Sequence, residues 1–369
     1  MPLDKNLVHK IRIKHGAEKI ILSLEEKGFC VAQLKDGTTE EMESRDVDEF
    51  LKKASSCSVA WVDYIVEDLK KEGPAIAAQL GFSDTLISTL MKSEHSGYED
   101  MDDEMGMLVP AILVEGFDVN VEYLLILLRG GLVATIHTTT VKRYFRLRRY
   151  AKIFMKKLKP ALPGKDKLTH VLIRIIDENN ARNFDHLREI EENSDKLSAK
   201  LSDVKTPRDE IGKDIHRMKH ALITYLNGLW ETVDVLNTLR YGDPELLTDD
   251  PKILQRLAGL VVEVNNQIGL AEHMSEVLAS GLEVMQSIYN NQLQILNNKL
   301  ALLVAYLTVL GTAFLVPNTI ATALGSSAFA LTPADQGWYM ALLLISMAVA
   351  TIGSYLWVKR MGLLPEKAD

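Results

Sequence analysis

A row of uncharged side chains in the C-terminal third of the sequence shares one helical face and could bind a hydrated cation. Hydroxyl and amide oxygens are neutral ligands that can replace or bind the water shell of such an ion. At 100° per residue these positions form one stripe, with Gly311 at its edge and Asn318 further round. Besides these two, the stripe contains Asn290, Gln294, Asn297, Ala301, Val304, Thr308, Thr312, Thr319, Thr322 and Ser326.

A stripe of this kind has two interpretations, and the sequence leaves both open. Inside lipid, a row of hydroxyls and small residues is typical of a contact between helices. The same row can line a water-filled path. Pro317 favours the path, because proline has no N–H and leaves the carbonyl of Ala313 without its helical donor. Proline kinks are nonetheless common in membrane helices.

The segment that carries the stripe is apolar enough to cross a membrane. Residues 300–324 contain no ionisable group except Tyr306, and residues 338–358 form a second uncharged run. As a helix the first run is about 37 Å long, whereas the hydrocarbon core of a bilayer needs only about 20 residues. The sequence therefore predicts two transmembrane helices at these residues, joined by an outer loop at residues 325–337.

The charges beside the two runs predict their orientation. Lys299 precedes the first run, and Lys359 and Arg360 begin a basic tail, residues 359–369, after the second. The loop between the runs has no Lys or Arg and one acid, Asp335. Because positive charge stays on the cytoplasmic side, we expect both termini to lie in the cytoplasm, with the chain in the inner (cell) membrane.

Residues 1–160 alternate between strand and helix patterns and predict a cytoplasmic α/β domain. Runs rich in Val, Ile, Leu and Tyr lie between glycines and charged turns, as is typical of strands. Arg129-Gly130-Gly131 predicts a tight hairpin turn. We expect strands at residues 19–24, 29–34, 58–64, 107–114, 121–128 and 132–137, and helices at about 66–80 and 84–93.

A basic helix is predicted at residues 142–158, which contain many Lys and Arg residues and no acid. It could touch anionic lipid headgroups or pair with the acidic stretch at residues 99–104. It could also be a solvated helix that pairs with other acidic neighbours.

The remaining cytoplasmic residues predict long helices. Apolar residues recur at helical spacing over residues 168–201 and 207–240, within a helical hairpin at residues 161–250. No proline occurs between Pro251 and Pro317, which permits one helix of about 100 Å whose stalk is residues 251–299. Such a helix needs partners, and two spans per chain cannot enclose a pore, so we expect either an anchor or a ring of several copies.

Composition and spacing argue against several other classes of function. The net charge of −8 argues against a nucleic-acid partner. No phosphate-binding loop or nucleophile triad can be argued from the spacing, so we expect no enzyme and no organic cofactor. His216 and His220 could bind a metal from one helix face, but no third ligand lies nearby in the sequence.

The order of these parts resembles the CorA family of divalent-cation channels over nearly the whole chain. That family has an N-terminal α/β domain, a helical hairpin, a very long helix entering the first span, a short outer loop, a second span and a basic tail. The resemblance is carried by Trp61-Val62-Asp63, Ala77-Ala78-Gln79-Leu80-Gly81-Phe82, Leu132-Val133-Ala134-Thr135-Ile136-His137, the stretch NFDHLREIEEN from Asn183, Ser280-Gly281-Leu282 and Lys359-Arg360.

The resemblance implies a funnel-shaped homopentamer in membrane lipid, with a central pore for Mg²⁺ lined by the first span. Asn297, with Asn290 two turns before it, resembles the inner polar ring of the family. The family signature Gly-Met-Asn at the outer end of this span is absent. Gly325-Ser326-Ser327 lies nearest, and the hydroxyls of Ser326 and Ser327 could replace the missing amide. Alternatively, Pro317-Asn318-Thr319 could supply an amide one or two turns deeper.

The regulatory ion site of the family also departs from its pattern. The resemblance places the regulatory aspartates at Thr89 and at about Leu260, neither of which is acidic. The regulatory metal site is therefore unknown, although Glu263 lies close enough to supply a carboxylate.

Two classes of function remain. The first is a channel that passes a divalent cation down its electrochemical gradient, with Mg²⁺ first and Zn²⁺, Co²⁺ or Ni²⁺ as alternatives. The second is a non-conducting scaffold or sensor, anchored in the membrane and built on the same fold. The polar stripe and Pro317 favour the channel, and the missing Gly-Met-Asn favours the scaffold.

Overall fold

The computed structural model describes residues 27–93, 96–202, 207–242, 244–326 and 332–361. The chain divides into two compact units, Met1–Ala279 and Ser280–Asp369. The expected strand at residues 19–24 lies outside the described residues.

The first unit is built on a mixed seven-stranded sheet whose strands follow the order β2-β1-β3-β7-β6-β5-β4. All neighbouring strands pair antiparallel except β3 and β7, which are parallel. The predicted α/β class is therefore confirmed. The strands are β1 (Gly28–Leu34), β2 (Thr39–Ser44), β3 (Cys57–Val66), β4 (Gly97–Asp100), β5 (Glu104–Glu115), β6 (Asp118–Arg129) and β7 (Leu132–Thr138).

The hairpin between β6 and β7 has the predicted two-residue turn. Arg129 pairs with Leu132, so only Gly130 and Gly131 form the connection. Their φ angles are +52° and +87°, in the left-handed region. Two consecutive positive φ angles define the type I′ turn, which glycine adopts without a Cβ clash.

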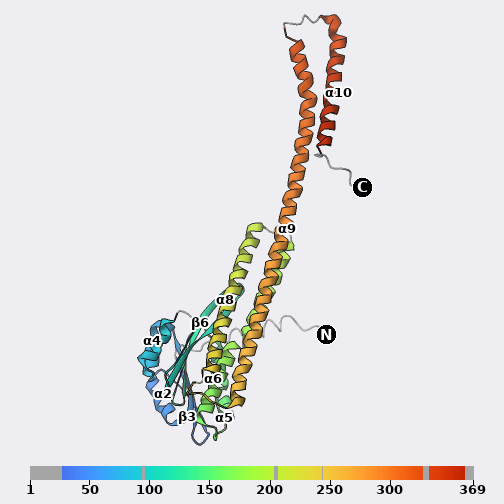
Figure 1. The fold of residues 1–369 in the computed structure, drawn as a ribbon. Helices are drawn as coiled ribbons and strands as arrows, with labels where there is room; N and C mark the ends of the chain where they lie inside the picture. Colours follow the sequence, from blue (N-terminus) through green and yellow to red (C-terminus); the bar gives the residue numbers. More distant parts are fainter. Residues whose placement is uncertain (1–26, 94–95, 203–206, 243, 327–331, 362–369) are drawn as a thin grey trace, which may run out of the picture. The chain divides into compact units, whose positions relative to one another are not determined.

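Helices cover both faces of the sheet (Figure 1). Side chains that alternate along β3 divide between the faces, with Val62 and Tyr64 in the core that also contains Phe50 and Leu86. On that face lie α2 (Val47–Ser55), α3 (Leu69–Gln79) and α4 (Asp84–Lys92). Against the other face lie α5 (Arg143–Lys157), α6 (Gly164–Asn180), α7 (Asn183–Ser202) and α8 (Arg208–Tyr241).

The helix predicted over residues 168–201 is divided in two. The structure ends α6 at Asn180 and begins α7 at Asn183. The buried guanidinium of Arg143 donates to the carbonyl oxygen of Asn179 and, over 2.5 Å, to that of Ile112. A side chain thus caps the last turn of α6 in place of the next helical N–H, which is a recognised cause of a helix break.

The basic helix α5 pairs with acids from its own unit. Arg146 contacts Glu178 of α6 at 2.6 Å, and Lys152 lies 3.4 Å from Glu41 of β2. None of the ion pairs among the described residues joins α5 to residues 99–104. The structure therefore favours the interpretation in which α5 is paired with other acidic neighbours.

One α5 residue reaches into the core. Arg148 donates through Nε to Asp63 Oδ2 over 2.6 Å, and both side chains are buried. Thr135 Oγ1 donates to Asp63 Oδ1 over 2.5 Å, and His137 Nε2 lies 3.2 Å from the same oxygen. The buried carboxylate thus joins α5 to the parallel strands β3 and β7.

The electrostatics of this cluster favour the charged carboxylate. Burial alone would raise the pKa of Asp63, but the guanidinium of Arg148 and the imidazole of His137 outweigh it. Hydrogen bonds from His137 and Thr135 act in the same direction. The pKa of Asp63 therefore lies below its usual value.

The long helix was predicted correctly as one continuous element. The structure forms a single helix, α9 (Pro251–Leu324), with Pro317 inside it. Its N-terminal part belongs to the first unit, where Leu257, Val264 and Ile268 are buried. Its C-terminal part belongs to the second unit.

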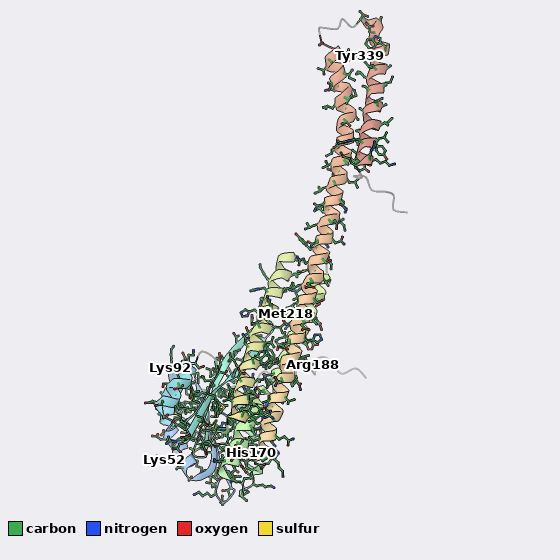
Figure 2. All side chains as sticks on the ribbon, viewed as in Figure 1. Lys52, Lys92, His170, Arg188, Met218 and Tyr339 are labelled. Atoms are coloured by element: carbon green, nitrogen blue, oxygen red, sulfur yellow. The ribbon has the colours of Figure 1, made fainter. Side chains whose placement is uncertain are left out.

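The second unit is a helical hairpin. After the 3-10 turn η1 (Pro333–Asp335), α10 (Gln336–Arg360) runs back beside the C-terminal part of α9 (Figure 1). Ala305, Ala313 and Val358 are buried. Most other apolar side chains project outward from the two helices (Figure 2).

Candidate functional site

Both helices of the second unit carry a stretch long and apolar enough to span a bilayer. Leu303, Leu310 and Leu344 are more than half exposed, at 55%, 60% and 63%. A continuous surface of such exposed apolar side chains is typical of a contact with lipid or with another protein. The two predicted spans therefore match two helices whose surfaces are suited to lipid.

The predicted polar stripe lies on this part of α9 and the turns before it. Nearly all of its members are exposed, and Thr312 is half-buried. The exposed members are Asn290, Gln294, Asn297, Ala301, Val304, Thr308, Gly311, Asn318, Thr319, Thr322 and Ser326. The hairpin therefore leaves the stripe exposed apart from Thr312.

The stripe hydroxyls all donate to carbonyl oxygens of their own helix. Thr308 Oγ1 donates to Val304 O, and Thr319 Oγ1 to Leu315 O, each over 2.8 Å. Thr312, Thr322 and Ser326 do the same over 2.8 to 3.0 Å. Because each proton is committed to the backbone, the oxygen presents only lone pairs outward. A column of such acceptors suits a cation or its water shell.

Sequence reasoning omitted one member of this face. Leu315 follows Gly311 by four residues and precedes Asn318 and Thr319 by three and four, so all four share a face. Its side chain is 67% exposed. An apolar residue in a polar column is a candidate constriction that gates by dewetting. The helical spacing in the sequence already put Leu315 on this face. It was missed because only polar residues were considered.

Two residues of the predicted selectivity region, Gly325 and Ser326, lie at the C-terminal end of α9. Gly325 N–H donates to Ala321 O over 2.8 Å, and Ser326 Oγ donates to Ala323 O over 2.8 Å. Both residues are exposed. Ser327 lies outside the described residues.

The one acid of the connection between α9 and α10 is engaged in capping. The carboxylate of Asp335 accepts from the backbone N–H and the hydroxyl of Thr332 over 2.8 and 2.7 Å. Its other oxygen accepts from Trp338 Nε1 over 2.9 Å. These bonds join η1 to the first turn of α10.

The positions matched to the regulatory ion site lie in the first unit. Thr89 donates to Thr85 O within α4, and Leu260 is buried on α9. Glu263 and Asp177 line an open hollow of about 830 Å³. Burial and the nearby charge of Asp177 raise the pKa of Glu263. Two carboxylates therefore lie close together beside Leu260.

Resident metal chemistry has little support elsewhere in the described part of the chain. No group of three or more His, Cys, Asp or Glu side chains there could hold a metal ion. His216 and His220 are both exposed on α8.

Comparison with protein families decides what kind of protein carries this arrangement. The family model of the CorA-like Mg²⁺ transporter protein matches residues 56–360. The chain belongs to this family. CorA-like proteins are membrane transporters of divalent cations, and the match runs from β3 through both apolar hairpin helices.

Solved structures share the fold of this chain. The complete CorA magnesium transporter from Methanocaldococcus jannaschii is 18% identical, with a TM-score of 0.66 over 91% of this chain and 98% of the other. The full-length CmaX protein is 14% identical, with a TM-score of 0.61 over 92% and 99%.

A third solved structure covers a smaller share of the chain. The cytoplasmic domain of ZntB from Vibrio parahaemolyticus is 14% identical, with a TM-score of 0.50 over 71% of this chain and 98% of the other. At these identities the structures show the fold alone. No curated protein matches the chain.

Proposed function

We propose that this protein is a CorA-like channel that passes divalent cations, Mg²⁺ first, down their electrochemical gradient. The observation that supports it best is the exposed column of hydroxyl acceptors on a membrane-length helix. Magnesium gives up its water reluctantly, so neutral oxygens that bind its hydration shell suit its passage. The ion is cargo, and the proposal needs no organic cofactor.

The proposal requires several copies of the chain, because one helical hairpin encloses no path. By resemblance to the family we propose a funnel-shaped homopentamer, with the stripe of each α9 facing a common axis. Asn290 and Asn297 then form polar rings at one end, and Thr319, Thr322 and Ser326 form rings toward the other. Leu315 forms an apolar ring between them.

The orientation follows from the charges at the ends of the hairpin. Lys299, Lys359 and Arg360 lie at one end, and the described outer turn carries Asp335. We therefore propose that both termini are cytoplasmic in the cell membrane.

A non-conducting scaffold or sensor on the same fold is the second candidate. The absence of Gly-Met-Asn from the outer end of α9 favours it, because Gly325 and Ser326 stand there instead. Passage of Zn²⁺, Co²⁺ or Ni²⁺ in place of Mg²⁺ is a variant of the channel proposal.

Cysteine accessibility separates a wet stripe from a packed one. In a Cys30→Ala, Cys57→Ala background, we expect Thr312→Cys and Thr319→Cys to react with a charged methanethiosulfonate reagent. Leu303→Cys and Leu310→Cys, which point away from the stripe, should react at least about tenfold more slowly, because thiolate formation and the reagent both need water. The labelling rates of the four variants, measured in proteoliposomes, test this expected difference. Equal, slow labelling at all four positions would mean that the stripe is a dry helix contact.

A further inference from the structure

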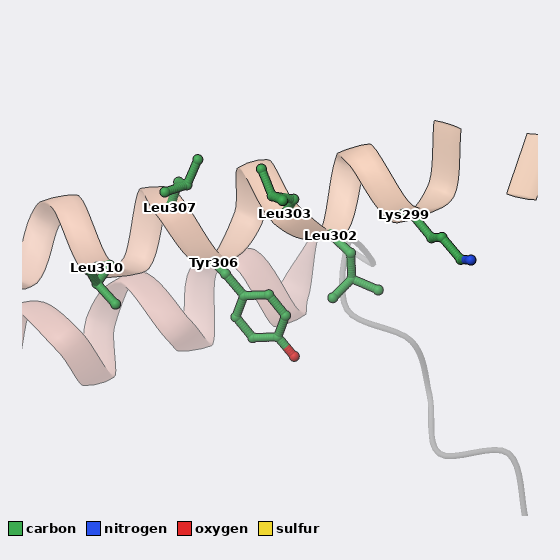
Figure 3. A pocket seen from close by; sticks show the side chains of 6 residues that line it. All are labelled: Lys299, Leu302, Leu303, Tyr306, Leu307 and Leu310. Atoms are coloured by element: carbon green, nitrogen blue, oxygen red, sulfur yellow. The ribbon is translucent and has the colours of Figure 1, made fainter. Parts of the chain in front are cut away.

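An open hollow of about 450 Å³ lies along α9 at the beginning of its membrane segment. Figure 3 shows the side chains that line it, with Lys299 at one end and leucines and a tyrosine along the rest. Leu303, Leu307 and Leu310 are 55–60% exposed. The lining consists of Lys299, Leu302, Leu303, Tyr306, Leu307 and Leu310.

The dimensions of this hollow match one lipid leaflet. From Lys299 to Leu310 the helix rises by about 16 Å. Half of a hydrocarbon core measures about 15 Å. An acyl chain that starts at the Lys299 end therefore reaches the bilayer middle near Leu310.

The charge at the Lys299 end of the described hairpin is positive. Because α10 runs back along α9, Lys359 and Arg360 lie at the same end of the hairpin as Lys299. All three side chains are exposed, and the ion pairs and hydrogen bonds of the described residues include none from them. The sequence has no Asp or Glu from residue 284 to 334 or from 336 to 365. The cations thus have no acidic partner within the hairpin.

We propose that this hollow binds an anionic membrane phospholipid. Its phosphate contacts Lys299, with Lys359 and Arg360 adding to the attraction, and one acyl chain lies on Leu303, Tyr306 and Leu310. Basic side chains beside membrane helices commonly recognise anionic headgroups in this way. The aromatic ring of Tyr306 supplies an apolar face below a polar hydroxyl.

This lipid site is distinct from the polar stripe. At 100° per residue, Lys299, Tyr306 and Leu310 lie about half a turn round the helix from Val304 and Thr308. A copy that turns its stripe toward an axis therefore keeps the hollow on its other side. The inference goes beyond cation passage, and its test requires no ion flux.

Native mass spectrometry of the full-length protein tests the proposal. The protein in mild detergent receives an equimolar mixture of phosphatidylglycerol and phosphatidylcholine, and the retained lipids are counted. We expect phosphatidylglycerol to be retained in preference. Lys299→Gln should reduce that preference about fivefold, the effect of one basic residue at a membrane surface. Lys299→Arg should keep it.

Leu303→Trp, which fills the hollow, should lower retention of both lipids. Two matched controls should leave retention unchanged: Lys219→Gln, on the exposed side of α8, and Leu344→Trp, exposed on α10. The intact oligomer mass reports that each variant is folded. Equal retention of the two lipids by the wild type, or an unchanged preference in Lys299→Gln, would overturn the proposal. Loss of the preference on addition of about 10 mM inorganic phosphate would overturn the proposal in favour of a site for free anions.

Discussion

Replacing Asp63 by asparagine should lower the free energy of unfolding of the first unit by about 3–5 kcal/mol. The substitution keeps the shape of the side chain but leaves the buried guanidinium of Arg148 without its counter-charge. An uncompensated buried charge costs more than the lost hydrogen bond itself. The melting temperature of the full-length protein, followed by circular dichroism, measures the loss.

The matched control is Asp118→Asn. Asp118 also pairs with an arginine, Arg217, at 3.2 Å, but both side chains are more than half exposed. An exposed pair contributes only about 0–1 kcal/mol. A double variant, Asp63→Leu with Arg148→Met, should recover part of the loss, because it removes both charges together. Equal effects of Asp63→Asn and Asp118→Asn would contradict this account of the core.

The pH dependence of the same variant has a definite sign. Because the pKa of Asp63 is depressed in the folded protein, its contribution is present above the unfolded pKa of about 4. It is lost as pH falls through the folded pKa. The difference in melting temperature between wild type and Asp63→Asn should therefore be constant from about pH 5 to 8 and shrink in more acidic solution.

Thr319→Leu combined with Ser326→Leu should reduce divalent-cation influx at least about tenfold. Each substitution replaces an outward hydroxyl acceptor by a bulky apolar group, so a hydrated ion loses its ligands and meets two added apolar rings. Influx into proteoliposomes that hold a divalent-ion dye measures the effect.

Thr351→Leu on α10 is the control for this pair. Thr351 also donates its hydroxyl to its own helix, over 2.7 Å to Met347 O, but it lies outside the stripe. We expect divalent-cation influx through the Thr351→Leu variant to equal that of the wild type. Unchanged influx in the stripe variant, or an equal loss in Thr351→Leu, would remove the stripe from the ion path.

Local patterns predicted most of the fold. Apolar runs between glycines located β1, β3, β5, β6 and β7 to within a few residues. Gly130 and Gly131 specified the turn, because few other residues adopt two positive φ angles. The absence of proline before Pro317 allowed α9 to be drawn as one helix.

The elements that sequence reasoning missed depend on their neighbours. Strands β2 and β4 have the sequences TEEMES and GYED, which are charged because both strands lie at sheet edges. The break before α7 comes from Arg143, a residue on another helix. Neither the edge position of these strands nor the contact from Arg143 can be read from a short window of sequence.

The geometry of the candidate site also depends on more than local sequence, and its role in ion passage stays a prediction. Helical spacing located Thr308, Thr312 and Thr319 on one face, and the structure leaves Thr308 and Thr319 exposed and Thr312 half-buried. The sequence could not show that their hydroxyl protons point to backbone carbonyl oxygens, because this depends on the geometry of the helix. Leu315 was missed because a leucine is a candidate constriction only where it lies on the same helix face as polar residues.

Cation influx by the wild-type protein tests the channel proposal most directly. The purified oligomer is placed in liposomes that hold a divalent-ion dye, and Mg²⁺, Co²⁺, Ni²⁺ and Zn²⁺ are added outside in turn, over a range of internal Mg²⁺. The proposal predicts influx of at least one of these ions, with Mg²⁺ among those that pass, above the rate of empty liposomes. No influx of any ion from an intact oligomer would contradict it and leave the membrane-anchored scaffold as the function.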